Sequence, residues 1–311
     1  TERLSLQAGV RRETIRNEVD DSIPYGEAVT AATVAGYQAR TLEGGNVRHS
    51  ETLFNLGAVY KLTDTQQLFA NFSQGFSLPD TQRMLRDVPA SFVIDSSSID
   101  SIKVNNYELG WRLGDASGLN AGVTAFYNTS DKVVQFNRDF SVSVADTDER
   151  VWGAEGNLQV PVVEGWTLGG TLAYTRGQYK DAAGNWRELN AFRVSPLKAT
   201  VYSDWRFLDG YGVRLQALTV GGSDRAYDDA QSAAISPTIR ATPATKIQGY
   251  TVVDLIAHAP WLGGEVGFGV YNLANRDYKT VYGQQAEATY GAISSLPAAG
   301  RTFGLSYSVA Y

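Results

Sequence analysis

Apolar side chains alternate with small or polar side chains along most of this chain, and this period of two constrains its fold more than any other feature. The clearest case is the final segment, residues 300–311. A period of two places one set of side chains on one face of a β-strand and the other set on the opposite face. The chain is therefore predicted to consist of strands with two chemically different faces. In the final segment the large apolar residues are Phe303, Leu305, Tyr307, Val309 and Tyr311.

The same alternation predicts twelve strands, and no comparable stretch has a convincing helical period. Five of the connections between them are short turns, and six are long and polar. Short turns on one rim and long loops on the other are typical of an antiparallel membrane β-barrel. The predicted strands are 3–13, 52–62, 66–77, 102–113, 118–130, 150–162, 166–178, 196–208, 211–222, 248–259, 264–275 and 300–311.

Composition excludes several other classes of protein. The 311 residues include no Cys and only two His, which excludes a disulfide scaffold, a thiolate zinc site and a thiol nucleophile. The net charge is −6, which disfavours nucleic-acid binding. No apolar run approaches the roughly 18 residues of a membrane helix. No signal peptide opens the chain, and Thr1 in place of Met is expected to mark a processing boundary.

Tryptophan placement favours a membrane barrel over a soluble up-and-down β-protein, which would show the same alternation. Four Trp fall at predicted strand ends beside short turns, and two lie toward the long loops. Membrane interfaces collect such amphipathic rings, whereas a soluble core would have Trp along the middle of its strands. The first group is Trp111, Trp166, Trp205 and Trp261, and the second is Trp152 and Trp186.

Four stretches of the sequence, in order, resemble the TonB-dependent outer-membrane receptors. Residues 71–80 read NFSQGFSLPD, similar to the aromatic-Ser-x-Gly-Phe-x-x-Pro signature of that family, and residues 106–112 read NYELGWR, similar to its Tyr-Glu-Leu-Gly segment. Residues 250–255 and 270–278 resemble the penultimate hairpin of the family, and residues 300–311 resemble its closing strand. Each piece alone is weak, but the four in this order and spacing are specific.

The resemblance implies an architecture larger than this chain. Members of that family have a TonB box, an N-terminal plug and a 22-stranded barrel, so residues 1–311 are expected to be the C-terminal part of the barrel. The plug and the first strands are then absent from this chain. An alternative is a complete barrel of twelve strands, either an outer-membrane enzyme or a passive porin or adhesin, since twelve is an allowed strand count.

No catalytic or metal-binding constellation is found, so the chain is not expected to be an enzyme. His49 and His258 have no Ser or Asp at a motif spacing, and an enzyme barrel would need a Ser–His pair on the outer rim. Strand carboxylates are expected to hydrogen-bond inside the barrel, and a loop cluster of acids is expected to be solvated because its spacing matches no calcium loop. The strand carboxylates are Glu108, Glu155 and Asp254, and the loop cluster is Asp146, Asp148 and Glu149.

The long loops carry Arg and Tyr residues that suit an anionic ligand. Arg presents a planar fork of donors to carboxylate and hydroxamate oxygens, and Tyr offers an amphipathic face. The family resemblance implies uptake of a ferric siderophore, of hydroxamate or citrate-hydroxamate type, with energy from the TonB-ExbB-ExbD system. Iron is then carried only as the ferric ligand, with no resident cofactor or metal. The candidate ligand-binding residues are Arg83, Arg86, Arg225, Tyr227, Arg240 and Tyr282.

The same resemblance implies the location and the assembly of the protein. It is expected in the bacterial outer membrane, in contact with lipid and lipopolysaccharide, with long loops outside the cell and short turns in the periplasm. The apolar residues of the final segment, Phe303 to Tyr311, resemble the signal read by the barrel-assembly machinery.

Overall fold

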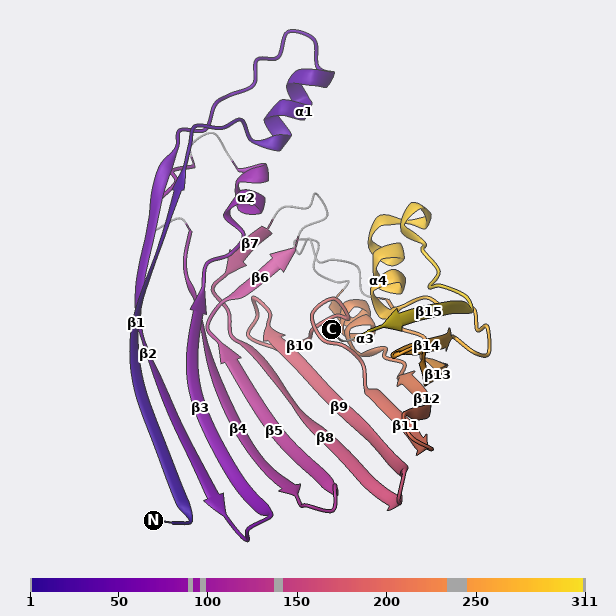
Figure 1. The fold of residues 1–311 in the computed structure, drawn as a ribbon. Helices are drawn as coiled ribbons and strands as arrows, with labels where there is room; N and C mark the ends of the chain where they lie inside the picture. The colour runs from indigo at the N-terminus through magenta and orange to yellow at the C-terminus, as the bar shows by residue number, and fades with distance from the viewer. Residues whose placement is uncertain (1, 89–91, 96–98, 137–141, 234–244, 310–311) are drawn as a thin grey trace.

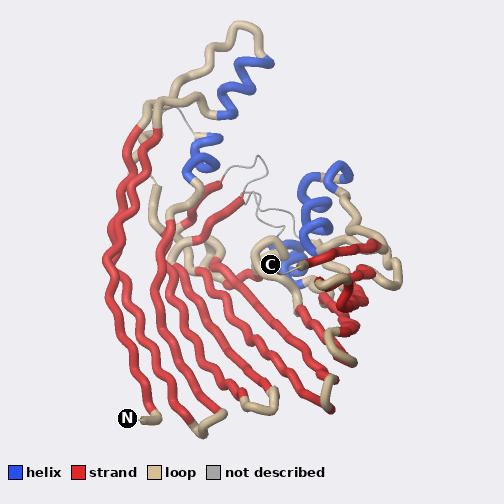
Figure 2. Tube along the Cα trace, in the orientation of Figure 1, coloured by secondary structure: helices blue, strands red, loops and turns tan. Residues whose placement is uncertain are grey.

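Twelve long strands form one continuous antiparallel wall in the computed structural model, which describes residues 2–88, 92–95, 99–136, 142–233 and 245–309 (Figures 1 and 2). Wall strands that follow one another along the chain are hydrogen-bonded neighbours in the sheet. The wall strands are β1 (Leu4–Val19), β2 (Gly45–Lys61), β3 (Gln66–Ser77), β4 (Ile102–Gly114), β5 (Asn120–Ser130), β8 (Glu149–Val163), β9 (Trp166–Lys180), β11 (Lys198–Phe207), β12 (Tyr211–Val220), β13 (Tyr250–Trp261), β14 (Gly264–Tyr271) and β15 (Thr302–Ser308).

All twelve predicted strands are confirmed, and the largest differences in their bounds lie in β1 and β2. These two strands stay paired from Leu4↔Tyr60 to Val19↔Gly45, well into the connection between the predicted strands 3–13 and 52–62. On the face that carries Leu6 and Val10, the extension carries Arg16 and Glu18, so the apolar alternation ends before the backbone pairing does. Among the described residues β1 and β15 each pair on one side only, so the wall is an open sheet with two free edges.

The outer face of the wall carries exposed apolar side chains arranged in rows. Leu6, Leu109 and Leu305 are 70%, 62% and 78% exposed, which fits a face that contacts lipid. Four aromatic residues form one row across β3, β4, β5 and β8, because each is the register partner of the next. We call this set, Phe72, Tyr107, Tyr127 and Trp152, the aromatic row.

A polar row lies two residues beyond the aromatic row, toward the long loops, and ends the apolar band. Its neighbours are hydrogen-bonded across the strands. Gln74 Nε2 donates to Asn105 Oδ1 at 2.8 Å, and Gln178 Nε2 donates to Glu188 Oε1 at 2.8 Å. The polar row is Gln74, Asn105, Thr129, Arg150, Gln178 and Glu188.

The inner face carries polar groups and rings that lie over glycines of the neighbouring strand. Four such pairs are register partners, and an added Cβ at any of these glycines would overlap the ring opposite. Glycine is therefore needed where the ring of one strand approaches the backbone of the next. The pairs are Phe69 with Gly110, Phe126 with Gly153, Tyr202 with Gly169, and His258 with Gly212.

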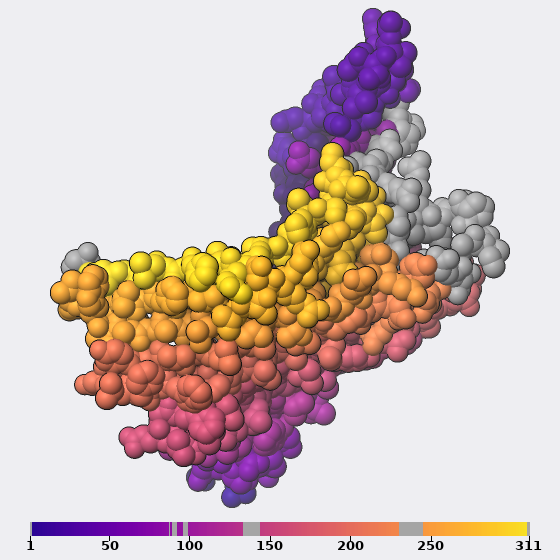
Figure 3. All heavy atoms as spheres, turned by 90° about the vertical axis from the view of Figure 1, so that its right-hand side faces the viewer, coloured from indigo at the N-terminus to yellow at the C-terminus, as the bar shows by residue number. Residues whose placement is uncertain are grey.

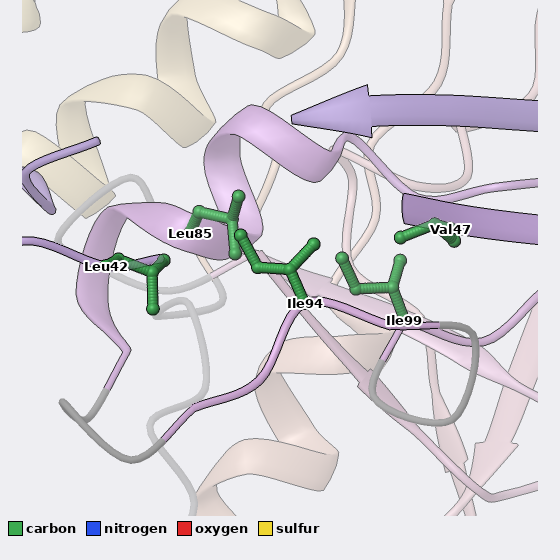
Figure 4. Close-up of a cluster of buried hydrophobic side chains, with 5 residues drawn as sticks. All are labelled: Leu42, Val47, Leu85, Ile94 and Ile99. Carbon is green, nitrogen blue, oxygen red and sulfur yellow. The ribbon is translucent and has the colours of Figure 1, made fainter. Parts of the chain in front are cut away.

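A second structural region, which we call the cap, stands on the long-loop end of β1 to β4. It contains α1 (Tyr25–Thr33), α2 (Thr81–Met84) and η1 (Leu85–Asp87), and rises above the wall in Figures 1 and 3. Its centre is a buried cluster that joins the β1–β2 and β3–β4 connections (Figure 4). The cluster is Leu42, Val47, Leu85, Ile94 and Ile99, each at most 7% exposed.

The remaining elements also lie in the long connections. β6 (Val133–Phe136) and β7 (Val142–Ala145) form a separate hairpin, and β10 (Trp186–Glu188) extends β9. α3 (Arg225–Ala233), α4 (Val281–Tyr290) and η2 (Ala292–Ser294) follow β12 and β14. α1, α3 and α4 are each only nine or ten residues long, so these helices do not conflict with the absence of a convincing helical period in the sequence. They are short and pack against loops, so they lack the apolar stripe that marks a helix in sequence.

No described helix is long and apolar enough to cross a membrane.

Candidate functional site

The six candidate ligand-binding residues fall into two groups on the long-loop rim. Arg83 and Arg86 belong to the cap, in α2 and η1. Arg225 and Tyr227 begin α3, and Tyr282 lies in α4. No contact between the described members of one group and those of the other is found. Arg240 lies outside the described residues.

The two cap arginines have different environments. Arg83 is half exposed, and its Nε lies 3.4 Å from Asp80 Oδ2, the residue that also caps α2 by accepting from the Arg83 backbone N–H. The Arg86 guanidinium stacks on the Tyr25 ring, 3.9 Å from the centroid. Arg86 therefore ties η1 to α1, whereas Arg83 keeps donors available to solvent.

The second group is held by contacts between three loops. Tyr282 is 68% exposed and meets the Phe192 ring edge-on, with centroids 5.4 Å apart. The backbone N–H of Gln248 donates to Gln284 Oε1 at 2.8 Å, which joins the β12–β13 and β14–β15 connections. Tyr227 lies under the Lys246 ammonium, 5.0 Å from the ring centroid. The sequence did not single out Phe192, because a lone Phe in a polar loop carries no pattern.

Arg225 is oriented by the wall. Its Nη2 donates to the Tyr174 hydroxyl at 3.0 Å, and the guanidinium lies 5.2 Å from the Tyr174 ring centroid. Tyr174 has the same strand parity as Leu172 of the outer face. Arg225 therefore approaches the rim from the lipid-facing side, unlike the exposed Tyr282.

Loop carboxylates of the predicted acidic cluster are paired with cations. Lys132 Nζ lies 2.8 Å from Asp100 and 2.5 Å from Asp146, and these hydrogen bonds raise its pKa above the ordinary value. Arg193 Nη2 lies 2.7 Å from Glu149 Oε2, at the loop end of β8. Among the described residues no group of three or more His, Asp or Glu side chains could hold a metal ion.

Asp254 and the two His residues have structural partners. Asp254 accepts from the Asn272 backbone N–H at 2.9 Å and from Gln216 Nε2 at 3.2 Å. His49 Nε2 lies 2.7 Å from the Ile99 carbonyl oxygen, and the His258 ring covers Gly212. These contacts fit the structural roles expected from the sequence.

The final strand presents its apolar residues outward, as predicted. Phe303, Leu305, Tyr307 and Val309 are exposed, and Tyr307 also packs edge-on against Trp261, with centroids 5.8 Å apart. Tyr311 lies outside the described residues. The Trp residues also occupy the two rims as predicted, with Trp166 and Trp205 adjacent near the short turns, 6.2 Å between centroids.

This wall of paired strands with an apolar outer face defines a membrane β-barrel protein. The family described as TonB dependent receptor-like, beta-barrel matches residues 1–273, and the chain belongs to that family.

Relatives with known functions match almost the whole chain. It is 32% identical to the "Ferric aerobactin receptor" of Klebsiella pneumoniae over 99% of its length and 42% of that protein. It is 31% identical to the "Rhizobactin receptor" of Rhizobium meliloti over 98% of its length and 41% of that protein. The chain therefore spans less than half the length of these relatives.

A solved structure has the same fold. The "Copper transporter OprC" superposes with a TM-score of 0.75 at 17% identity, over 97% of this chain and 45% of that one. At this identity the likeness shows the fold alone.

Proposed function

We propose that the protein to which this chain belongs takes up a ferric siderophore of hydroxamate or citrate-hydroxamate type, with energy supplied through TonB-ExbB-ExbD. The observation that carries this proposal is the identity to a ferric aerobactin receptor over 99% of the chain. The iron is cargo within the ligand, and no bond of the ligand is made or broken. No resident cofactor, metal ion, catalytic step or nucleic-acid partner is part of the proposal.

The chain is proposed to be the C-terminal part of a 22-stranded barrel whose plug and first strands lie elsewhere in the protein. The two free edges of the wall and the 42% coverage of the relative support this architecture. The long loops would then face outside the cell and the short turns the periplasm. Reading the gene upstream of the codon for Thr1 tests this part: ten further strands and a plug are expected.

Growth measurements test uptake. Deleting the gene in a strain without other siderophore receptors should abolish growth on one hydroxamate or citrate-hydroxamate siderophore as sole iron source. Unchanged growth across both types and catecholates would contradict the proposal. The wild-type gene should restore growth to the deletion strain, whereas a gene without its TonB box should not. This result would support TonB as the source of energy for uptake.

Ligand capture is tested residue by residue. Alanine substitution of Arg83, Arg86, Arg225, Tyr227, Arg240 and Tyr282 is expected to divide the set, because a contact that loses its water on binding contributes far more than a solvated one. The exposed Arg83 and Tyr282 are the first choices, since Arg86 and Arg225 already stack on rings of the protein. One or two variants should lose about tenfold in affinity, about 1.4 kcal/mol, measured by Trp quenching at fixed ionic strength. If the affinities of all six variants stay within about twofold of the wild-type affinity, the binding site lies on other parts of the protein.

The outward apolar residues of β15 are proposed to form the assembly signal together with Val309 and Tyr311. Tyr311→Asp should lower the yield of heat-modifiable barrel in the outer membrane. The matched change Ser308→Asp, on the opposite strand parity, should lower it less. Equal yields for Tyr311→Asp and the wild type would contradict the signal.

A further inference from the structure

The exposed side of α1 is uncharged, although this helix stands at the end of the cap farthest from the short turns (Figure 1). Residues 22–39 include one charged side chain, Glu27. A helix that meets water normally turns a polar, charged side outward, whereas a helix that is uncharged nearly all round is typically buried. We call the exposed residues of this helix, Tyr25, Ala28, Val29, Ala32 and Thr33, the α1 face.

The one charge of α1 points away from this face. The Glu27 side chain is 15% exposed, and its Oε2 accepts from the Tyr37 hydroxyl at 2.6 Å and from the Arg40 backbone N–H at 3.2 Å. Its Oε1 lies 3.3 Å from Arg40 Nη2. These contacts hold the segment after α1 against the charged side of the helix. Rotation of α1 would break them, so the α1 face is fixed outward.

The membrane and a second copy are poor covers for the α1 face. On the outer side of β1, Arg16 and Glu18 lie between α1 and the apolar residues Leu6 and Val10, so α1 lies beyond the apolar band. A stable interface between two proteins buries about 800 Å² on each partner. A helix of nine residues is only about 14 Å long and offers too little area for such an interface.

The free edge of β1 leads directly to the α1 face. β1 pairs with β2 from Leu4 to Val19, and on its other side it pairs with no strand in the described part of the chain. A further strand can add backbone hydrogen bonds along such an edge. Val19 lies six residues before Tyr25, and the bridge between Ser22 and Leu42 holds the segment between them. A strand paired with β1 up to Val19 would therefore bring its loop to α1.

The proposed architecture supplies that strand. The chain covers 42% of the ferric aerobactin receptor that it matches, and the first strands are proposed to lie elsewhere in the protein. β1 runs from the short-turn rim to the long-loop rim, so an antiparallel neighbour runs the opposite way, and a long loop leads into it (Figure 1). A segment tethered beside the α1 face has a high effective concentration there, so a small contact area is sufficient.

We propose that the α1 face is covered by an apolar segment of the long loop that leads into the strand preceding β1, in the part of the protein outside this chain. Aliphatic or aromatic side chains of that segment pack on Val29 and against the small Ala28 and Ala32. The contact closes the outer rim between the two parts of the barrel. This inference rests on the architecture proposed above, and not on the identity of the ligand.

The experiment places a benzophenone amino acid at position 29 of the full-length protein in outer membranes. Irradiation should join this residue to a peptide of the loop that leads into the strand preceding β1, identified by mass spectrometry. The matched position is Gln38, which is exposed in the same connection but lies outside α1 and should not give that product. A product with a second copy, another protein, a lipid or the plug would overturn the proposal, and so would the same product from both positions.

A second measurement decides the question if the benzophenone variant fails to assemble. Val29→Cys, as the only Cys of the full-length protein, should react with a water-soluble maleimide about tenfold more slowly than Gln38→Cys, because access limits the reaction of a thiol. Dilution of the protein should not change this ratio. Equal rates would overturn the proposal, as would protection that is lost on dilution, which indicates a second copy.

The gene sequence upstream of the codon for Thr1 separates two kinds of failure. If no further strands are encoded there, the proposed architecture fails together with this inference. If the strands are encoded and Val29→Cys reacts as fast as Gln38→Cys, the covering segment alone is refuted.

Discussion

The wall and the cap use apolar side chains in opposite ways. In the wall the large apolar residues are exposed, as with Leu109 at 62% and Leu305 at 78%, whereas Val47 and Ile99 in the cap are 0% exposed. The cap packs its apolar side chains against one another, and their burial contributes to stability through the hydrophobic effect. The wall is proposed to meet lipid, so its stability comes from strand pairing and from close approach across its inner face. The same two strands, β1 and β2, therefore belong both to a region with exposed apolar side chains and to a region with buried ones.

The largest expected effect concerns the ring and glycine pairs of the wall. A Cβ at Gly153 would lie 2.8 Å from Phe126 Cζ and would overlap the Tyr174 carbonyl oxygen, so backbone would have to move. Gly153→Val should remove most of the heat-modifiable barrel from the outer membrane. Gly75→Val is the matched control, because nothing lies within 4 Å of its Cβ position. Comparable yields for the two variants would show that ring and glycine contacts do not hold the wall.

The next effect tests the cap as a conventional buried core. Ile99→Ala removes a side chain that is 0% exposed and should cost the cap about 2–5 kcal/mol of local stability. Hydrogen exchange should then speed up at the Leu42 amide, which donates to the Ser22 carbonyl at 2.7 Å, while amides of β9 stay protected. Leu109→Ala in the wall should change neither region measurably. A cap that keeps its protection in Ile99→Ala would contradict the burial argument.

A third effect tests which face of the wall meets lipid. Leu158→Arg places a charge in the apolar band and should cost about 2–4 kcal/mol. Asn157→Arg, one residue away on the inner face, should be nearly neutral because that face is polar. Urea unfolding in vesicles measures both. A larger loss for Asn157→Arg would reverse the assigned faces.

The smallest effect concerns an ion triad that links the β3–β4 connection to the β6–β7 hairpin. Lys132 is 17% exposed and contacts Asp100 and Asp146. Lys132→Met should cost about 1 kcal/mol or less, because both carboxylates can be rehydrated. The measurement is the rate of limited proteolysis within residues 131–149, which should rise a few-fold. Arg11→Met, which breaks an exposed pair within β1, is the control and should leave that rate unchanged.

The sequence predicted the wall well because one face of each strand requires apolar side chains and the other requires polar or small ones. This requirement repeats at every second residue. The prediction 66–77 coincides with β3, and the outward set Phe303, Leu305 and Tyr307 lies as expected. Where this alternation ends, the predicted strand also ends. β1 continues to Val19 with Arg16 and Glu18 on the face where Leu6 and Val10 lie earlier in the strand, and only its pairing with β2 marks this part as a strand.

The sequence indicated where the candidate ligand-binding residues lie, but not how they are grouped. The residue types and the rim were chosen from sequence, and the described candidates do lie in the long connections. Their grouping was not predictable, because it depends on contacts between loops far apart in sequence, such as Phe192 with Tyr282. The contact between Arg225 and Tyr174 of the wall was unpredictable for the same reason.

By itself, the sequence determined the strand number, the two faces and the family, because each follows from a repeating local pattern or a contiguous motif. Only the tertiary structure decided the cap cluster and the ion triad. Leu42 and Ile99, or Lys132 and Asp146, carry no shared period, and meet only because strand register and loop packing bring them together. Local patterns fix which face a residue occupies, whereas non-local pairing fixes its neighbours.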